Sequence, residues 1–208
     1  MNKLIVITLL ALSTSIFAQD QVAQEVIDKL NTTTKAYDNM TIEFIFILEN
    51  KNQNIKESQQ GTLVVAGEKF QLTMNNQTII NDGESQWVYL ADMNEVQIIE
   101  HDPEENMMSP NKIFTISKED YKYMYVDTQS EKGKRLQIID LFPKESQEFI
   151  KINIAVDAAK NQLERITMHD KNGGTYTYLV NSFKSNTVIK PFIFNIKEFP
   201  DAEVIDLR

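Results

Sequence analysis

Residues Gly61 to Ile99 read GTLVVAGEKFQLTMNNQTIINDGESQWVYLADMNEVQII, and this stretch decides the fold class. It consists of short apolar runs separated by polar turn residues such as Asn75-Asn76 and Asn81-Asp82-Gly83-Glu84. Runs of this length joined by such short turns predict antiparallel strands connected by hairpins. We therefore expect a β-meander in the middle of the chain, with strands over 61–65, 69–74, 77–80, 86–90 and 95–99.

The strand pattern continues on both sides of this meander. From Thr41 to Glu49 the period is two, and Ile45 and Ile47 make even the second face partly apolar, so apolar groups are expected on both sides of this strand. Lys171-Asn172-Gly173-Gly174 is a strong hairpin turn, because Asn and Gly accept the positive φ that it needs. Further strands are predicted over 121–127, 135–142, 148–156, 162–169, 175–182 and 192–196.

Helical spacing occurs in two places. Val22, Val26 and Leu30 predict an amphipathic helix that ends near residues 31–34. Ser109-Pro110, followed by Ile113 and Phe114, resembles a helix start with Pro at the first helical position. About a dozen strands in one sheet cannot stay flat. We expect a mainly β protein, a curved antiparallel half-barrel of about 11–12 strands whose concave face is covered by two or three short helices.

The first eighteen residues are typical of an export signal. Lys3 supplies the positive charge, Leu4 to Leu12 the apolar run, and Ser15 to Ala18 the cleavage region. The apolar run is shorter than the roughly 20 residues of a spanning helix, so a membrane anchor is the weaker alternative. We expect cleavage near Ala18, which leaves residues 19–208 as a single domain in the periplasm.

Charge and composition exclude several classes of function. The formal net charge is −9, and removal of Lys3 makes it one unit more negative, which argues against nucleic acid or an anionic membrane surface as a partner. Without cysteine the chain has no disulfide and no thiol nucleophile. His101 and His169 lack a second His at ligand spacing, and no nucleophile motif or phosphate-binding loop is present. We expect no enzyme, no cofactor and no metal.

Apolar and aromatic side chains are more abundant on these strands than a single buried face needs. One interpretation is that they simply fill a core. The other is a concave apolar cavity for an alkyl chain, in which each buried CH₂ contributes roughly 0.8 kcal/mol. The residues expected to line it are Phe44, Phe46, Leu63, Val65, Phe70, Leu72, Trp87, Tyr89, Ile113, Phe114, Tyr123, Tyr178, Phe192 and Phe194.

The order of motifs resembles the LolA family of outer-membrane lipoprotein carriers. The resemblance rests on a G-x-L strand (Gly61-Thr62-Leu63), a basic-aromatic pair (Lys69-Phe70) and the D-G-x-x-x-W-x-Y hairpin of residues 82–89 that is followed by Gln97. Ser109-Pro110-x-x-Ile113 is similar to the family's second helix, and Phe192-x-Phe194, Pro200 and Val204-Ile205-Asp206 to its closing strand and tail.

The resemblance implies a periplasmic chaperone that receives acylated lipoproteins from an inner-membrane ABC-type release complex and delivers them to an outer-membrane receptor. We expect it to act as a monomer. The family often has an arginine after the G-x-L strand that holds the helical lid closed, and this chain has none there. Lys69 is the candidate for a partial substitute, although it lacks the planar guanidinium.

Two alternatives stay open at this point. The same fold can serve as a binding module for another apolar molecule, such as a phospholipid or a pigment precursor. It can also be a non-catalytic interaction domain of the envelope, which needs no cavity.

Overall fold

The computed structural model describes residues 20–100, 116–145, 148–199 and 201–208. The expected signal peptide, His101 and the expected helix start at Ser109-Pro110 lie outside these ranges, as do Ile113 and Phe114.

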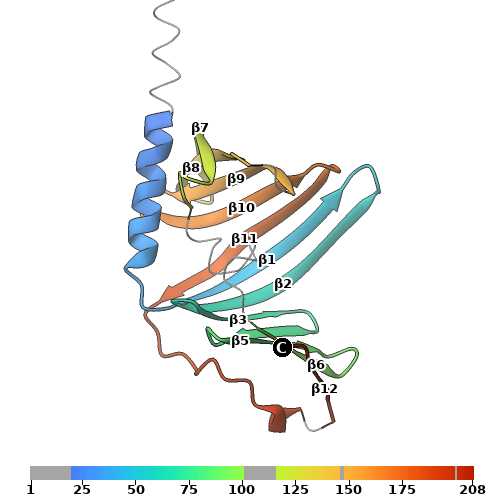
Figure 1. The fold of residues 1–208 in the computed structure, drawn as a ribbon. Helices are drawn as coiled ribbons and strands as arrows, with labels where there is room; N and C mark the ends of the chain where they lie inside the picture. Colours follow the sequence, from blue (N-terminus) through green and yellow to red (C-terminus); the bar gives the residue numbers. More distant parts are fainter. Residues whose placement is uncertain (1–19, 101–115, 146–147, 200) are drawn as a thin grey trace, which may run out of the picture.

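One 12-stranded sheet dominates the described residues, and Figure 1 shows it bent into an open trough. The strand order is β12-β6-β5-β4-β3-β2-β1-β11-β10-β9-β8-β7. Neighbours pair antiparallel except β12, which runs parallel to β6. The strands are β1 (Met40–Asn50), β2 (Ile55–Ala66), β3 (Lys69–Met74), β4 (Gln77–Asn81), β5 (Ser85–Leu90), β6 (Glu95–Glu100), β7 (Tyr121–Glu131), β8 (Lys134–Pro143), β9 (Phe149–Asp157), β10 (Gln162–Asp170), β11 (Gly174–Ser185) and β12 (Glu203–Asp206).

The first eleven strands confirm the predicted positions, but β2 begins at Ile55 rather than at Gly61 and β7 continues to Glu131 rather than to Asp127. The predicted strand over 192–196 is wrong. That segment is irregular and runs into the 3₁₀ turn η2 (Ile196–Glu198), and the strand that closes this edge is β12. Phe192 and Phe194 alternate in the sequence as strand residues would. In the structure, Phe194 stacks on Trp87 of β5 instead.

An α-helix over residues 20–35 precedes β1 and stands at one side of the sheet in Figure 1. It is amphipathic as predicted, with Ala23, Val26, Ile27 and Leu30 buried. Neither the expected number of helices nor their position over the concave face is confirmed, because this helix and the short η2 are the helical elements of the described residues. Neither is long and apolar enough to cross a bilayer.

One hydrophobic cluster joins the helix to the sheet. We call the sheet face that carries this cluster the inner face and the opposite one the outer face. A smaller cluster of Leu136, Ile138 and Ala155 lies on the outer face, since these residues alternate with members of the large cluster. The fully or almost fully buried members of the large cluster are Ala23, Val26, Ile27, Leu30, Met40, Ile42, Phe44, Leu63, Val65, Phe70, Ile116, Tyr123, Ile139, Leu141, Phe149, Ile154, Val156, Leu163, Ile166 and Met168.

The turn between β10 and β11 forms as the sequence predicted. Gly173 has a φ of +83°, and the Asp170 side chain closes the turn. Its Oδ1 accepts hydrogen bonds from the backbone N–H groups of Asn172 and Gly174, both at 2.7 Å, and its Oδ2 accepts one from the Tyr176 hydroxyl at 3.1 Å. The hydrogen bond from Gly174, aided by those from Asn172 and Tyr176, lowers the pKa of the Asp170 carboxyl.

Candidate functional site

The inner face remains apolar well beyond the part that the helix contacts. Partly buried hydrophobic side chains continue the cluster along β1, β3, β4, β7, β9 and β11. These side chains extend the apolar layer from the helix side of the sheet to β3 and β4 at the far side in Figure 1. The group comprises Tyr37, Phe46, Leu72, Met74, Ile79, Tyr121, Tyr125, Ile152, Tyr176, Tyr178, Val180 and Phe183.

Most of the expected cavity residues lie on this face. Eight of them belong to the large cluster or pack directly against it: Phe44, Phe46, Leu63, Val65, Phe70, Leu72, Tyr123 and Tyr178. Phe192 is buried but belongs to neither cluster. Met74, Ile79 and Val180 were not predicted from the sequence. Met74 and Val180 continue the alternation of Leu72 and Tyr178, whereas Ile79 lies on β4, where no cavity residue was predicted.

Trp87, Tyr89 and Phe194 require a correction, because the structure places Trp87 and Tyr89 on the outer face. Val88 pairs with Ile79 of the inner face, so its two neighbours point the other way. Phe194 stacks on Trp87 with the ring centroids 6.3 Å apart. The rings of Phe194 and Phe199 stack at 5.3 Å, and Phe199 lies 4.2 Å from Tyr89.

Lys69 also lies away from the helix. It is exposed and precedes Phe70, which is buried on the inner face, so its side chain belongs to the outer face. Its charge acts on Asp82 in the β4–β5 turn. Burial opposes ionisation of Asp82, but the backbone N–H groups of Ser85 and Glu84 and the charge of Lys69 outweigh it, and the pKa of Asp82 is lowered. The contact between Lys69 and a lid stays a prediction, because the expected helix start at Ser109-Pro110 lies outside the described residues.

Three aromatic rings form the centre of the inner face. The Tyr178 ring lies 5.6 Å from that of Phe44 and 5.0 Å from that of Phe46, measured between centroids. Phe44 lies directly over Gly61 of β2, where any Cβ would overlap its ring. Burial raises the pKa of the Tyr178 hydroxyl. Gly61 of the G-x-L motif thus provides the space into which Phe44 packs.

Within the part of the chain that the structure describes, Asn81 Nδ2 and Tyr123 Oη are buried on the inner face without a hydrogen-bond partner. Asn81 pairs with Phe70, and Tyr123 with Leu141, which places both side chains on this face. Burial, with the charge of Asp28 as a smaller contribution, raises the pKa of Tyr123 to about 12. Buried polar groups without partners are rare in folded proteins, so these two are candidate contacts for a polar group of a ligand.

Few directional contacts hold the helix against the sheet. Asn31 Nδ2 donates to the Ile116 carbonyl at 2.7 Å, and Asn31 Oδ1 accepts from the Ile116 N–H at 3.2 Å. Just beyond the helix, Gln162 Nε2 donates to Tyr37 Oη at 2.8 Å. Among the described residues, no side-chain hydrogen bond joins residues 20–30 to a strand. The first part of the helix is therefore held by apolar contacts, which are non-directional.

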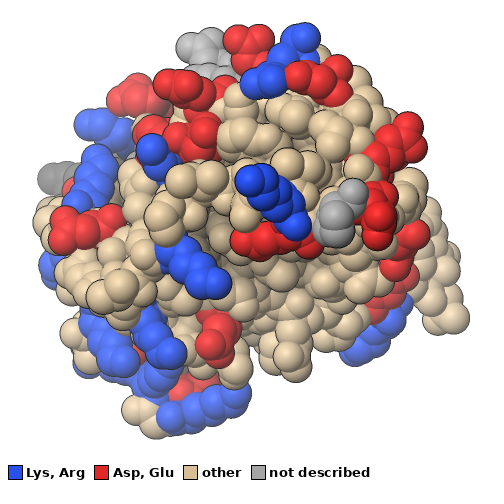
Figure 2. Space-filling view, turned by 90° about the horizontal axis from the view of Figure 1, so that it is seen from below, with Lys and Arg blue, Asp and Glu red and all other residues tan. Residues whose placement is uncertain are grey.

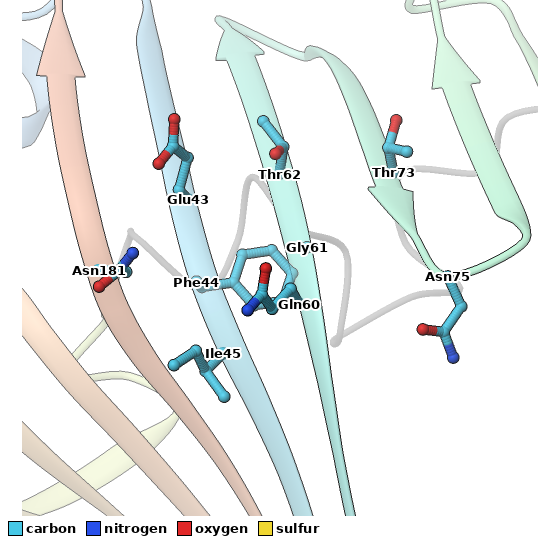
Figure 3. Close-up of a pocket in the computed structure, with 9 residues that line it drawn as sticks. All are labelled: Glu43, Phe44, Ile45, Gln60, Gly61, Thr62, Thr73, Asn75 and Asn181. Atoms are coloured by element: carbon cyan, nitrogen blue, oxygen red, sulfur yellow. The ribbon is translucent and has the colours of Figure 1, made fainter.

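The outer face carries a polar pocket of about 420 Å³, which Figure 3 shows across β11, β1, β2 and β3. Its polar lining does not suit an alkyl chain. A hollow of about 300 Å³ lies elsewhere, at the turn end of the inner face, and its lining is also largely polar: Gln59, Met74, Asn75, Asn76, Gln77, Leu90, Asp92 and Met93. The polar pocket is lined by Glu43, Phe44, Ile45, Gln60, Gly61, Thr62, Thr73, Asn75 and Asn181.

The described residues contain no group of three or more His, Asp or Glu side chains that could hold a metal. His169 lies on the outer face of β10, where burial and the nearby charge of Lys151 lower its pKa. No catalytic arrangement is built around it within the part of the chain that the structure describes.

Comparisons with known proteins identify the family. The model of the outer membrane lipoprotein carrier protein LolA matches residues 35–197. The outer-membrane lipoprotein carrier protein of Legionella pneumophila (strain Corby) is 24% identical over 208 residues, which cover 99% of both chains.

Two solved structures share the fold at low sequence identity. An uncharacterised conserved protein from Thermus thermophilus has a TM-score of 0.59 and 12% identity, with 89% of this chain and 99% of that one covered. The lipoprotein LppX of Mycobacterium tuberculosis has a TM-score of 0.51 and 12% identity, with 83% and 99% covered. Because the family model spans most of its length, this chain belongs to the LolA family of outer membrane lipoprotein carrier proteins.

Proposed function

We propose that this protein is a periplasmic carrier that holds the acyl chains of lipoproteins on its inner face and moves them from the inner to the outer membrane. The observation that carries the proposal is the apolar inner face, which continues past the helix through Phe46, Leu72 and Tyr178. Membership of a lipoprotein-carrier family supports a lipid- or lipoprotein-binding module without catalytic activity.

Loading requires the acyl chain to compete with the helix for this face. The helix buries Val26, Ile27 and Leu30, each worth about 2 kcal/mol, or ~6 kcal/mol together. Each acyl CH₂ buried in their place contributes roughly 0.8 kcal/mol. About eight methylenes therefore match the apolar contacts of the helix, and a longer acyl chain exceeds them. The helix acts as a lid that an acyl chain displaces.

The carrier role also defines the partners and the compartment. In this proposal an inner-membrane ABC-type complex releases the lipoprotein to the monomeric carrier, and an outer-membrane receptor accepts it. The export signal in residues 1–18 is removed near Ala18, and the domain of residues 19–208 works in the periplasm.

Depletion of the protein from the cell that makes it tests this role. Lipoproteins destined for the outer membrane should accumulate in the inner membrane, as measured by separating the two membranes and blotting for lipoproteins. Re-supply of the wild-type chain should restore their sorting. Unchanged sorting after full depletion would refute the carrier role.

A carrier of another lipid is the second candidate, and the position of the arginines favours it. The chain has only Arg135, Arg165 and Arg208, and none of them belongs to the inner-face cluster. Arg165 pairs with Glu131, and Arg208 with Asp206. The inner face thus lacks the arginine that the family often uses to hold its lid. Native mass spectrometry of the protein from its own periplasm separates the candidates, because a co-purifying phospholipid or pigment mass would contradict the lipoprotein.

A further inference from the structure

The segment that leaves β11 differs in charge from the rest of the chain. Residues 184–197 contain Lys184, Lys190 and Lys197 and no acidic residue, although the whole chain has 30 acidic residues against 21 basic ones. We call residues 184–197 the basic strip. The local charge of the strip is thus opposite in sign to the net charge of −9.

The three lysines of the strip are exposed, and none forms an ion pair with any described residue. The strip forms the lowest part of the molecule in Figure 1, and Figure 2 looks at it from below. Basic and acidic side chains both occur on that face. The strip therefore carries three lysines without an ion pair to the described residues, and the nearest acidic residue along the chain is Glu198, directly after Lys197.

Apolar side chains are exposed on the same strip. Val188 is 104% exposed, Ile193 70% and Ile196 43%. Three of the ten large hydrophobic side chains exposed among the described residues lie on the strip. Single exposed hydrophobic residues are normal, but such a concentration beside unpaired lysines is typical of an interaction surface.

The structure holds the strip in place, so its outward side chains have a fixed direction. Near its start, Asn39 Nδ2 donates to the Thr187 carbonyl at 3.0 Å, and Asn39 Oδ1 accepts from the Thr187 N–H at 3.1 Å. At its other end, Phe194 stacks on Trp87 and Phe199. Because Phe194 points to the sheet, its neighbour Ile193 points outward.

We propose that the basic strip docks the protein on an anionic lipid surface. Its lysines would lie among the lipid headgroups, and Val188 and Ile193 would enter the boundary with the acyl chains. The net negative charge does not prevent this, because acidic groups more than about 10 Å from the surface are screened at 0.1 M salt. The expectation from net charge alone, that such surfaces are excluded as partners, thus does not apply to this part of the molecule. The inference does not depend on the carrier role.

Vesicle sedimentation of the exported protein, lacking residues 1–18, tests the proposal. The probes are phosphatidylcholine vesicles with and without one third phosphatidylglycerol, in low salt and in 0.5 M salt. The test variant changes Lys184, Lys190 and Lys197 to Gln. The matched control changes Lys51, Lys122 and Lys160 to Gln; these are equally exposed, lie on other turns and strands, and alter the net charge by the same amount.

We expect binding to the anionic vesicles that weakens in high salt. A lysine near an anionic surface contributes about fivefold to the binding constant, so the strip variant should bind at least roughly tenfold more weakly and the control like wild type. A second comparison tests the apolar side chains. The double variant Val188→Ser with Ile193→Ser should bind the anionic vesicles more weakly than wild type, whereas the control Met124→Ser with Ile150→Ser should bind like wild type. Circular dichroism checks that every variant is folded.

Three results would overturn the proposal. They are equal binding to neutral and anionic vesicles, equal losses in the strip variant and its control, and no vesicle binding even in low salt. If the wild type does not bind vesicles, a synthetic acidic peptide is tested next. Binding of this peptide to the wild type but not to the strip variant would make the strip a protein-docking surface instead.

Discussion

Replacing Tyr123 with phenylalanine removes one buried hydroxyl and leaves the ring in place. The residue is 6% exposed, and its Oη has no hydrogen-bond partner among the described residues. A hydroxyl buried in this way costs about 1–3 kcal/mol relative to water. We therefore expect Tyr123→Phe to raise the free energy of unfolding of the ligand-free protein by about 1 kcal/mol. Most substitutions of buried residues destabilise a protein, so the sign is informative.

Urea unfolding followed by circular dichroism measures this effect, and Tyr37→Phe is the matched control. The Tyr37 hydroxyl accepts a hydrogen bond from Gln162 Nε2 at 2.8 Å. Its removal should lower the free energy of unfolding by about 1 kcal/mol. For a domain of this size each kcal/mol corresponds to a shift of roughly 2–4 °C in Tm, so the two variants should move in opposite directions.

A loss of stability in Tyr123→Phe equal to that in Tyr37→Phe would refute the reasoning. It would mean that the Tyr123 hydroxyl has a hydrogen-bond partner in the folded protein. The hydroxyl would then not be available to a ligand, and Asn81 would remain as the inner-face candidate for a polar contact.

Three other perturbations test separate parts of the structure. Gly61→Val should lower the free energy of unfolding by about 1–3 kcal/mol, because its Cβ overlaps the Phe44 ring, and adding Phe44→Leu should recover part of the loss in the same urea assay. Phe46→Ala should weaken the binding of a fluorescent fatty acid severalfold, whereas Trp87→Phe on the outer face should not; the reverse order would contradict the assignment of faces. Asp170 has a lowered pKa in the folded state, so its carboxylate stabilises the protein above the unfolded pKa of about 3.9, and this contribution is lost as the pH falls. The difference in urea midpoint between wild type and Asp170→Asn should accordingly be present at pH 7 and shrink below pH 4, and a pH-independent difference would argue against this role.

The strands were predictable because their signals are local. Alternation over Ile42, Phe44 and Phe46 and the turn at Gly173 each depend on neighbours within a few residues, and β1 and the β10–β11 turn formed accordingly. The strand predicted at residues 192–196 failed for the same reason. Its alternation was real, but the partner of Phe194 was Trp87, more than a hundred positions away in the chain.

The candidate site was predictable only in part. Within β5, the sequence shows that Trp87 and Tyr89 share one face and Val88 lies on the other. It does not show which face turns to the core, because both are apolar. The structure decides this through the pairing of Val88 with Ile79, and the C-terminal segment then covers the opposite face. Eight of the fourteen expected cavity residues belong to the inner-face cluster or pack against it.

The sequence by itself determined the fold class, most strand positions and the family resemblance. Hydrophobic period, turn residues and motifs each depend on residues that are close together in the chain. The tertiary structure decided which apolar face became the inner one, and it placed Lys69 away from the helix. It also fixed residues 184–197 against the outer face with their lysines directed to solvent. These features depend on contacts between segments far apart in the chain, whose pairing follows from the free energy of the whole packed structure rather than from any local pattern.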